Sequence, residues 1–145
     1  MTRVVAALLT LAVGLGLTAC GDPGEPYCRA LKEAQPSFAE MADDPAGLLS
    51  HRPLLRQLAG KAPDDLTDEW QTLLSALDAF AVTLDKAGID PAEFRGTEDL
   101  SGLDEQQRAA ITQAASQLAA SDVADATNGI GQQAADVCKV QIGLG

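Results

Sequence analysis

Histidine, aromatic side chains and basic residues are all scarce in this chain, and each shortage excludes a class of function. One His, one Trp, one Tyr and three Phe offer little material for a base-stacking surface, a catalytic triad or a metal site. Ten Lys and Arg stand against 21 Asp and Glu, which gives a net charge of −11. That charge would repel phosphate groups, so nucleic acid is not expected as a partner. We also expect no metal and no other cofactor.

Charged residues make up only 21% of the chain, whereas hydrophobic residues make up 46%. A chain of this composition can build a hydrophobic core and does not have the character of a disordered protein. Its 145 residues suit one domain at most.

The amino-terminal region lacks a hydrophobic run long enough to cross a bilayer. Arg3 precedes an apolar run over residues 4–16, and a span needs about 20 apolar residues. A short basic start, an apolar run of this length and small residues after it are typical of a secretory signal peptide. We therefore predict a signal peptide over residues 1–19.

The predicted signal peptide ends in Leu17-Thr18-Ala19-Cys20, which resembles the lipobox of bacterial lipoproteins. In that family the cysteine thiol receives a diacylglycerol, and the chain is cut just before the cysteine. The resemblance implies that Cys20 carries acyl chains such as palmitate and anchors the protein to the extracytoplasmic face of the cell membrane. Each buried methylene contributes about 0.8 kcal/mol, so two chains anchor far more firmly than one. The alternative is an ordinary secretory leader cut near Ala19, with Cys20 an incidental thiol.

The segment after Cys20 reads Gly-Asp-Pro-Gly-Glu-Pro and offers no apolar side chain to bury. Its glycines and prolines predict a flexible tether over residues 20–26. The helical domain would then occupy residues 27–145.

The chain has three cysteines, so they cannot all pair with one another. If lipid modifies Cys20, an even pair remains, Cys28 and Cys138. Export would place this pair in an oxidising compartment, where a disulfide is expected. The bond would join the two ends of the domain, and the chain-entropy model gives about 4.7 kcal/mol for a loop of this size. Two buried free thiols or a redox pair are the alternatives, although redox pairs are usually close in sequence.

Apolar residues recur at three- and four-residue steps along most of the chain, and we find no sustained period-two alternation. The clearest helix is predicted over residues 65–87, with Gly88 as its C-cap. Pro36 should kink or break the first helix, and Gly129 and Gly131 should weaken the last one near Asn128. The remaining predicted segments are helices over 27–42, 48–61, 104–119 and 122–141, and a helical turn over 89–94 in a loop that extends to 102. Phe94 and Leu100 would fasten this loop to the core.

These segments predict an all-α fold. We expect an antiparallel bundle of about four main helices plus a short one, with the first and last tied by the disulfide.

Candidate chemistry is sparse. Neighbouring acids could bind calcium or act as an acid and base, but nearly all lie where a predicted helix begins, and capping explains them there. These pairs are Asp43-Asp44, Asp64-Asp65, Asp68-Glu69, Glu98-Asp99 and Asp104-Glu105. His51 is interpreted as a surface residue, and no local catalytic signature accompanies it. We predict no catalytic residue.

Other candidates are a basic cluster, a glycine pair and the aromatic residues. Arg52, Arg56 and Lys61 could contact a partner, or they could form a solvated face paired with acids. Gly129-Ile130-Gly131 lacks the context of a phosphate loop. At helical spacing, Trp70, Phe80 and Phe94 favour a core over a ligand pocket.

The whole layout resembles small lipoproteins of actinobacteria. The resemblance rests on the lipobox, the tether, a Cys at each end of the domain and the helical segment Leu58-Ala59-Gly60-Lys61-Ala62-Pro63-Asp64-Asp65-Leu66. It implies surface anchoring and no particular reaction.

We therefore expect a non-enzymatic interaction or accessory module that presents an acidic surface to a protein partner. The alternative is a small-ligand or lipid carrier or sensor with an apolar cavity between helices, and an enzyme comes third. A large apolar cavity would favour the carrier, whereas a filled core with an exposed apolar patch would favour the interaction module.

Overall fold

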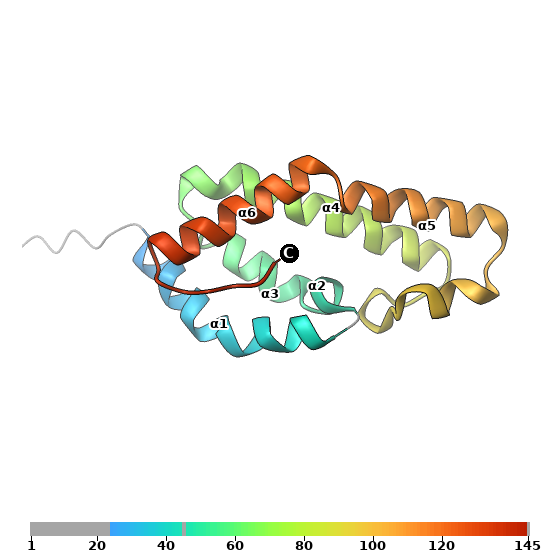
Figure 1. The fold of residues 1–145 in the computed structure, drawn as a ribbon, viewed down its shortest axis with the longest axis horizontal. Helices are drawn as coiled ribbons and strands as arrows, with labels where there is room; N and C mark the ends of the chain where they lie inside the picture. The colour runs from blue at the N-terminus through green and yellow to red at the C-terminus, as the bar shows by residue number, and fades with distance from the viewer. Residues whose placement is uncertain (1–23, 45, 145) are drawn as a thin grey trace, which may run out of the picture.

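The computed structural model describes residues 24–44 and 46–144 of the chain. Within these ranges the protein contains α-helices and short 3-10 helices and no strand (Figure 1). The prediction of an all-α fold is therefore confirmed. The predicted signal peptide, the lipobox, Cys20 and most of the predicted tether lie outside the described residues.

The described helices follow one another with short connections. The α-helices are α1 (Glu25–Asp43), α2 (Gly47–Ser50), α3 (Arg52–Ala59), α4 (Thr67–Lys86), α5 (Glu105–Leu118) and α6 (Ser121–Asp136). The 3-10 helices are η1 (Asp64–Leu66), η2 (Pro91–Glu93) and η3 (Gly96–Gly102).

Helix α4 is the centre of the fold and confirms the clearest prediction from the sequence. Its apolar stripe is buried along its whole length, because side chains three and four positions apart share one face of a helix. The buried residues of α4 are Trp70, Leu73, Leu77, Phe80, Ala81 and Leu84. Gly88, expected to end this helix, takes a φ of 80°, a left-handed conformation that favours glycine.

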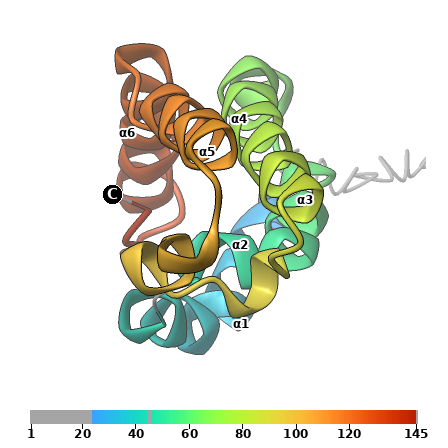
Figure 2. The same cartoon turned by 90° about the vertical axis from the view of Figure 1, so that its right-hand side faces the viewer.

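The other helices pack around α4 on two sides. Helix α3 contacts α4 on one side, and α5 and α6 follow one another along the other (Figure 1). Helix α1 packs against α2 and α3. In Figure 2, α3 and α4 lie toward the right of the molecule. On the left, α5 and α6 lie above and are separated from α1 and α2 below.

A tyrosine and a tryptophan link α1 to α4 in the core. The Nε1–H of Trp70 donates a hydrogen bond to the hydroxyl oxygen of Tyr27 at 3.1 Å, and the two rings meet edge to face. Burial raises the pKa of Tyr27 to about 12, because the phenolate would be poorly solvated there. Buried aromatic polar atoms are expected to be paired in this way.

Helix α1 differs from the prediction at both its start and its middle. It begins at Glu25, so Glu25 and Pro26 form a helical turn where a tether was expected. Pro26 favours this start, because proline fixes a helical φ and its missing N–H is not needed in the first turn. The helix also continues through Pro36, which is exposed. Water can therefore reach the carbonyl that the missing N–H of Pro36 leaves free.

The helix predicted over 48–61 and the loop predicted over 89–102 are both found, but the helix is divided in two. The helix expected over 48–61 is split at His51 into α2 and α3, and Pro53 lies in the first turn of α3. The loop over 89–102 contains η2 and η3. The rings of Phe94 and Phe80 meet edge to face, with their centroids 5.6 Å apart. Phe94 and Leu100 both pack against the core, as expected.

The last helix ends earlier than predicted. Helix α6 stops at Asp136 instead of continuing to residue 141, and it runs unbroken past Asn128. Gly129 allows close approach to α4, since a Cβ atom there would lie 3.3 Å from Cγ of Glu69. Three residues after the end of α6, Lys139 takes a left-handed φ of 57°, which redirects the chain.

Residues 137–144 follow α6, and we call them the C-terminal strap; they turn at Val137 and Cys138 and then run on without helix (Figure 1). Its side chains alternate between core and solvent: Cys138, Val140 and Leu144 are buried, Ile142 is half-buried, and the residues between them are exposed. This period-two pattern was present in the sequence and our helical assignment missed it. The alternation covers only residues 138–144, which is too short to stand out beside a long helical phase.

Cys28 and Cys138 form the predicted disulfide, which closes a separation of 110 residues. The bond ties the first turns of α1 to the start of the C-terminal strap. It therefore fixes both ends of the described domain to each other.

Candidate functional site

The strongest candidate site is an apolar opening between α2, α4, α5, α6 and the C-terminal strap, and we call it the front cleft. It has a volume of about 170 Å³. Four elements and the strap contribute to it, and Thr127 supplies its one polar side chain. The lining residues are Leu48, Leu73, Leu118, Val123, Ala124, Thr127 and Leu144. None of the described residues that line this cleft is charged, so they offer van der Waals contact and burial without a fixed electrostatic partner.

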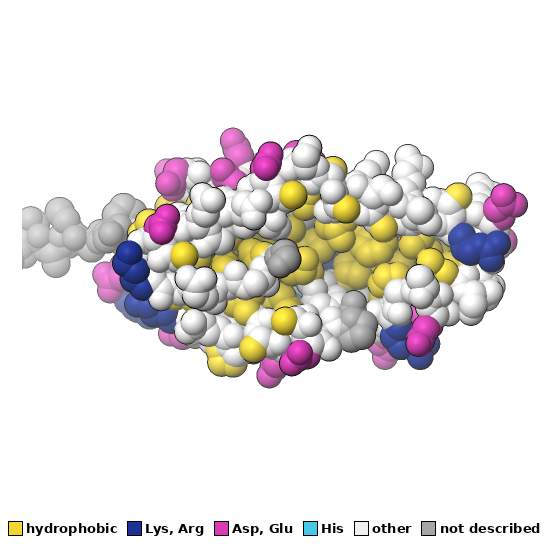
Figure 3. Space-filling view, viewed as in Figure 1, with side chains coloured by type: hydrophobic (Ala, Val, Ile, Leu, Met, Phe, Trp, Pro, Cys, Tyr) yellow, Lys and Arg dark blue, Asp and Glu magenta, His cyan; other side chains and the backbone are white. Residues whose placement is uncertain are grey.

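Figure 3 shows the face of the molecule that α5, α6 and the C-terminal strap form. Hydrophobic side chains gather in a hollowed area below α5 and α6, whereas acidic and basic side chains lie toward the edges. The C-terminal strap crosses one part of this face, and the hydrophobic area continues beyond its end (Figures 1 and 3). The site is therefore an open, uncharged floor with a charged border.

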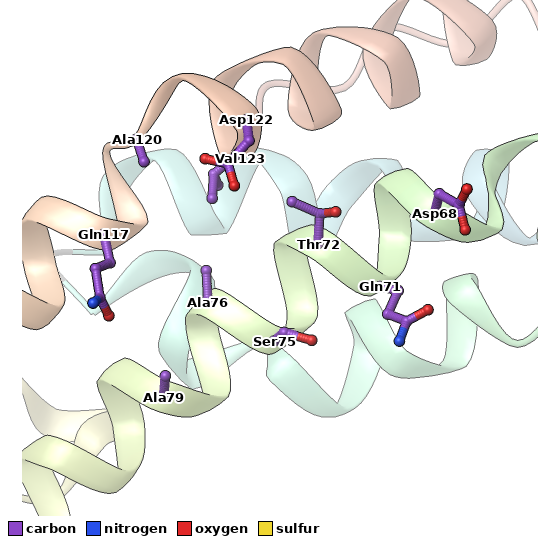
Figure 4. A pocket seen from close by; sticks show the side chains of 10 residues that line it. All are labelled: Asp68, Gln71, Thr72, Ser75, Ala76, Ala79, Gln117, Ala120, Asp122 and Val123. Atoms are coloured by element: carbon purple, nitrogen blue, oxygen red, sulfur yellow. The ribbon is translucent and has the colours of Figure 1, made fainter.

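A second groove, which we call the α4 groove, lies between one side of α4 and the corner between α5 and α6. It has a volume of about 610 Å³, and Figure 4 shows its lining side chains. Carboxylates, amides and hydroxyls alternate there with small apolar groups, and no His, Cys, Lys or Arg is among the residues that line it. These residues are Asp68, Gln71, Thr72, Ser75, Ala76, Ala79, Gln117, Ala120, Asp122 and Val123.

A Ser, a His and an Asp come together beside α2, which the sequence did not indicate. The Ser50 hydroxyl donates to Oδ2 of Asp44 at 2.7 Å, and Oγ of Ser50 lies 2.9 Å from Nδ1 of His51. Nδ1 also lies 3.0 Å from the carbonyl oxygen of Gly47. The Ser50 hydroxyl also lies 2.9 Å from this carbonyl oxygen, and the tautomer of the His51 ring decides whether Nδ1 donates or accepts in its two contacts.

This order of contacts differs from that of a catalytic triad. In a triad the carboxylate orients the histidine and the histidine takes the serine proton, whereas here the Ser50 proton goes to the carboxylate. The Ser50 hydroxyl, followed by the amide of Ala46, holds the pKa of Asp44 below its usual value. We interpret the cluster as a turn that fixes α2 after the end of α1. His51 is half-buried in it rather than fully on the surface.

The acidic pairs have mostly local roles, as predicted. Asp104 accepts a hydrogen bond from the Gln107 amide at 2.8 Å, and Gln107 Oε1 accepts one from the Asp104 amide, which completes a capping box. Asp99 accepts from the backbone amide and the guanidinium of Arg95, and both hold the pKa of Asp99 below its usual value. Asp68 and Glu69 lie in the first turn of α4, where the helix dipole favours negative charge.

Two of the three cations proposed for a partner contact have an internal partner. Arg52 and Arg56 of α3 both reach Oδ1 of Asp78 on α4, at 3.4 Å for Arg52. Lys61 is exposed, near Glu33 and Ser37 of α1 in a small surface pocket. Arg52 and Arg56 thus hold α3 against α4, and contact of this cluster with a partner stays a prediction.

The aromatic residues belong to the core, as the sequence favoured. Trp70 and Phe80 are buried, and Phe94 is half-buried against Phe80. Neither the front cleft nor the α4 groove has one of these rings in its lining.

Among residues 24–44 and 46–144, no helix has the length and hydropathy of a membrane span. The same residues contain no group of three or more His, Cys, Asp or Glu that could hold a metal ion. Comparison with protein-family models, with curated proteins and with solved structures finds no match for this chain.

Proposed function

We propose that this protein is a lipoprotein anchored at the extracytoplasmic face of the cell membrane, where it acts as a non-enzymatic interaction module. The lipobox-like run that ends in Cys20 supports the anchor. The Cys28–Cys138 disulfide supports export, because such bonds persist in oxidising compartments and are rare in the cytosol. We further propose that the helices form an antiparallel bundle in which α5 and α6 together take the place of one long helix.

The open, aliphatic front cleft is the observation that carries the interaction role. Exposed apolar area costs free energy in water, so a hollowed apolar area on one face is typical of a surface that a partner covers. The core beneath it is filled by well-buried side chains from α1, α3, α4 and α6.

A carrier for small ligands is the competing function. Ligand pockets usually enclose about 300–1,000 Å³ and cover most of the ligand's surface. The front cleft holds about 170 Å³ and is open to solvent on the face in Figure 3. This size and openness favour contact with a partner over storage of a whole ligand.

The interaction role can be tested with a photo-crosslinking amino acid placed in the cleft. Leu118 is half-buried in the cleft lining, whereas Val82 is 48% exposed on α4 and is not among the lining residues. In native membranes we expect a discrete crosslinked protein product from position 118 and none from position 82. Equal products from both positions, or none from position 118, would contradict the interaction role.

The anchor has its own test. Replacement of Cys20 by Ser removes the thiol that lipid would modify, so we expect the Cys20→Ser protein in the soluble fraction of the envelope. The natural chain and a Val82→Ser control should stay with the membrane, because two acyl chains bind a bilayer firmly. Retention of the Cys20→Ser protein in the membrane fraction would overturn the anchor.

A further inference from the structure

We propose that the front cleft binds an extended segment of a partner protein that has aliphatic residues at every second position. This inference rests on the proposed interaction role and names the form of the partner.

The C-terminal strap provides the first step, because its residues after Lys139 run without helix across this face (Figure 1). Val140 and Leu144 are 1% and 8% exposed, and the alternate residues Lys139 and Gln141 face solvent. The Val140 amide donates to the Ala134 carbonyl at 3.0 Å, so α6 also satisfies one backbone group of the strap. This face therefore accepts extended backbone with a period-two side-chain pattern.

The second step is that the C-terminal strap and the front cleft adjoin each other. Leu144 belongs both to the strap and to the lining of the front cleft, so the cleft begins where the described strap ends. The hydrophobic floor in Figure 3 extends beyond that point. A segment laid in line with the strap would continue the same mode of packing.

The openness of the site favours this occupant over an acyl chain. An acyl chain is apolar on every side, and an open cleft would leave one side of it in water. An alternating segment has one apolar side for the cleft and one polar side, with its backbone groups, for the solvent. A net charge of −11 also favours Lys or Arg at the outward positions of the partner.

The experiment uses the full mature chain and two short peptides of identical composition. One peptide places Val, Ile and Leu at alternate positions with Lys between them, and the other arranges the same residues at three- and four-residue steps. We expect the alternating peptide to bind at least about tenfold more tightly, since one misplaced aliphatic side chain changes affinity by about that much. Fluorescence anisotropy of labelled peptides measures both affinities.

Variants of the protein locate the binding site. Leu118→Gln places a polar group in the cleft lining, and Val82→Gln makes the same type of change outside it. We expect Leu118→Gln to weaken the alternating peptide about tenfold and Val82→Gln to leave it unchanged. Circular dichroism melting confirms that both variants are folded.

Each contrary result has a definite meaning. Failure of the alternating peptide to bind, or tighter binding of the helical-period peptide, overturns the inference. Displacement of the peptide by decanoic acid with greater affinity assigns the cleft to an acyl chain and overturns it as well. The crosslink from position 118 could still form in those cases, so the interaction role would stand or fall separately.

Discussion

Replacing Cys28 and Cys138 with Ser is expected to lower the free energy of unfolding by about 4 to 5 kcal/mol. The disulfide spans 110 residues, and removing it gives the unfolded chain back the freedom of a very long loop. It also releases the start of the C-terminal strap. Urea denaturation of the natural and doubly substituted chains measures the change.

Two further measurements make this prediction specific. Reductant should destabilise the natural chain to the same extent and leave the Cys28→Ser/Cys138→Ser chain unaffected. Trypsin should cut sooner at Lys139, which is exposed, once the strap is untied. A change in unfolding free energy below about 1 kcal/mol would contradict the prediction, because it would place the loss under the usual range for a native disulfide.

Trp70→Ala is expected to cost about 3 to 5 kcal/mol of unfolding free energy. Trp70 is 1% exposed, so its removal leaves a cavity between α1 and α4 and deprives the Tyr27 hydroxyl of its donor. The control Val82→Ala changes an exposed residue of the same helix, with an expected effect within about 0.5 kcal/mol. Equal effects of the two changes would contradict the assignment of Trp70 to the core.

The single tyrosine gives a second readout of the same change. In the natural protein Tyr27 has a pKa raised by burial from 10.0 to about 12, so the unfolded chain loses the phenolic proton first as pH rises. Stability from this group is therefore complete below about pH 10 and is lost as pH rises toward about 12. In Trp70→Ala water reaches the hydroxyl, and a spectrophotometric titration should show a lower pKa.

The sequence predicted those helical features that depend on residues only a few positions apart. The stripe of α4 repeats at three- and four-residue steps, and the Asp104–Gln107 capping box joins residues three apart. Such contacts depend only on helical geometry, so they can be read before the fold is known. The Cys28–Cys138 bond was also predictable, because pairing in an oxidising compartment depends on the number of cysteines.

Other features depended on competition between local preference and distant contacts. The residues of 137–141 extend a helical phase in the sequence. In the structure α6 nevertheless ends at Asp136, Cys138 is bonded to Cys28, and Lys139 takes a left-handed conformation. Likewise, Arg52 and Arg56 meet Asp78 only because α3 packs on α4. A sequence without its fold shows the charges and not their partners.

The sequence by itself determined that the domain is all-helical and that a disulfide joins its ends. It also determined that the chain has few residues of the types used in catalysis or metal binding. The tertiary structure alone decided the path of the C-terminal strap and the existence of the front cleft. Helical phase acts between residues three or four apart, whereas the cleft depends on the placing of α2, α4, α5, α6 and the strap around one opening. Cys20 lies outside the described residues, and its proposed lipid anchor rests on the sequence motif alone.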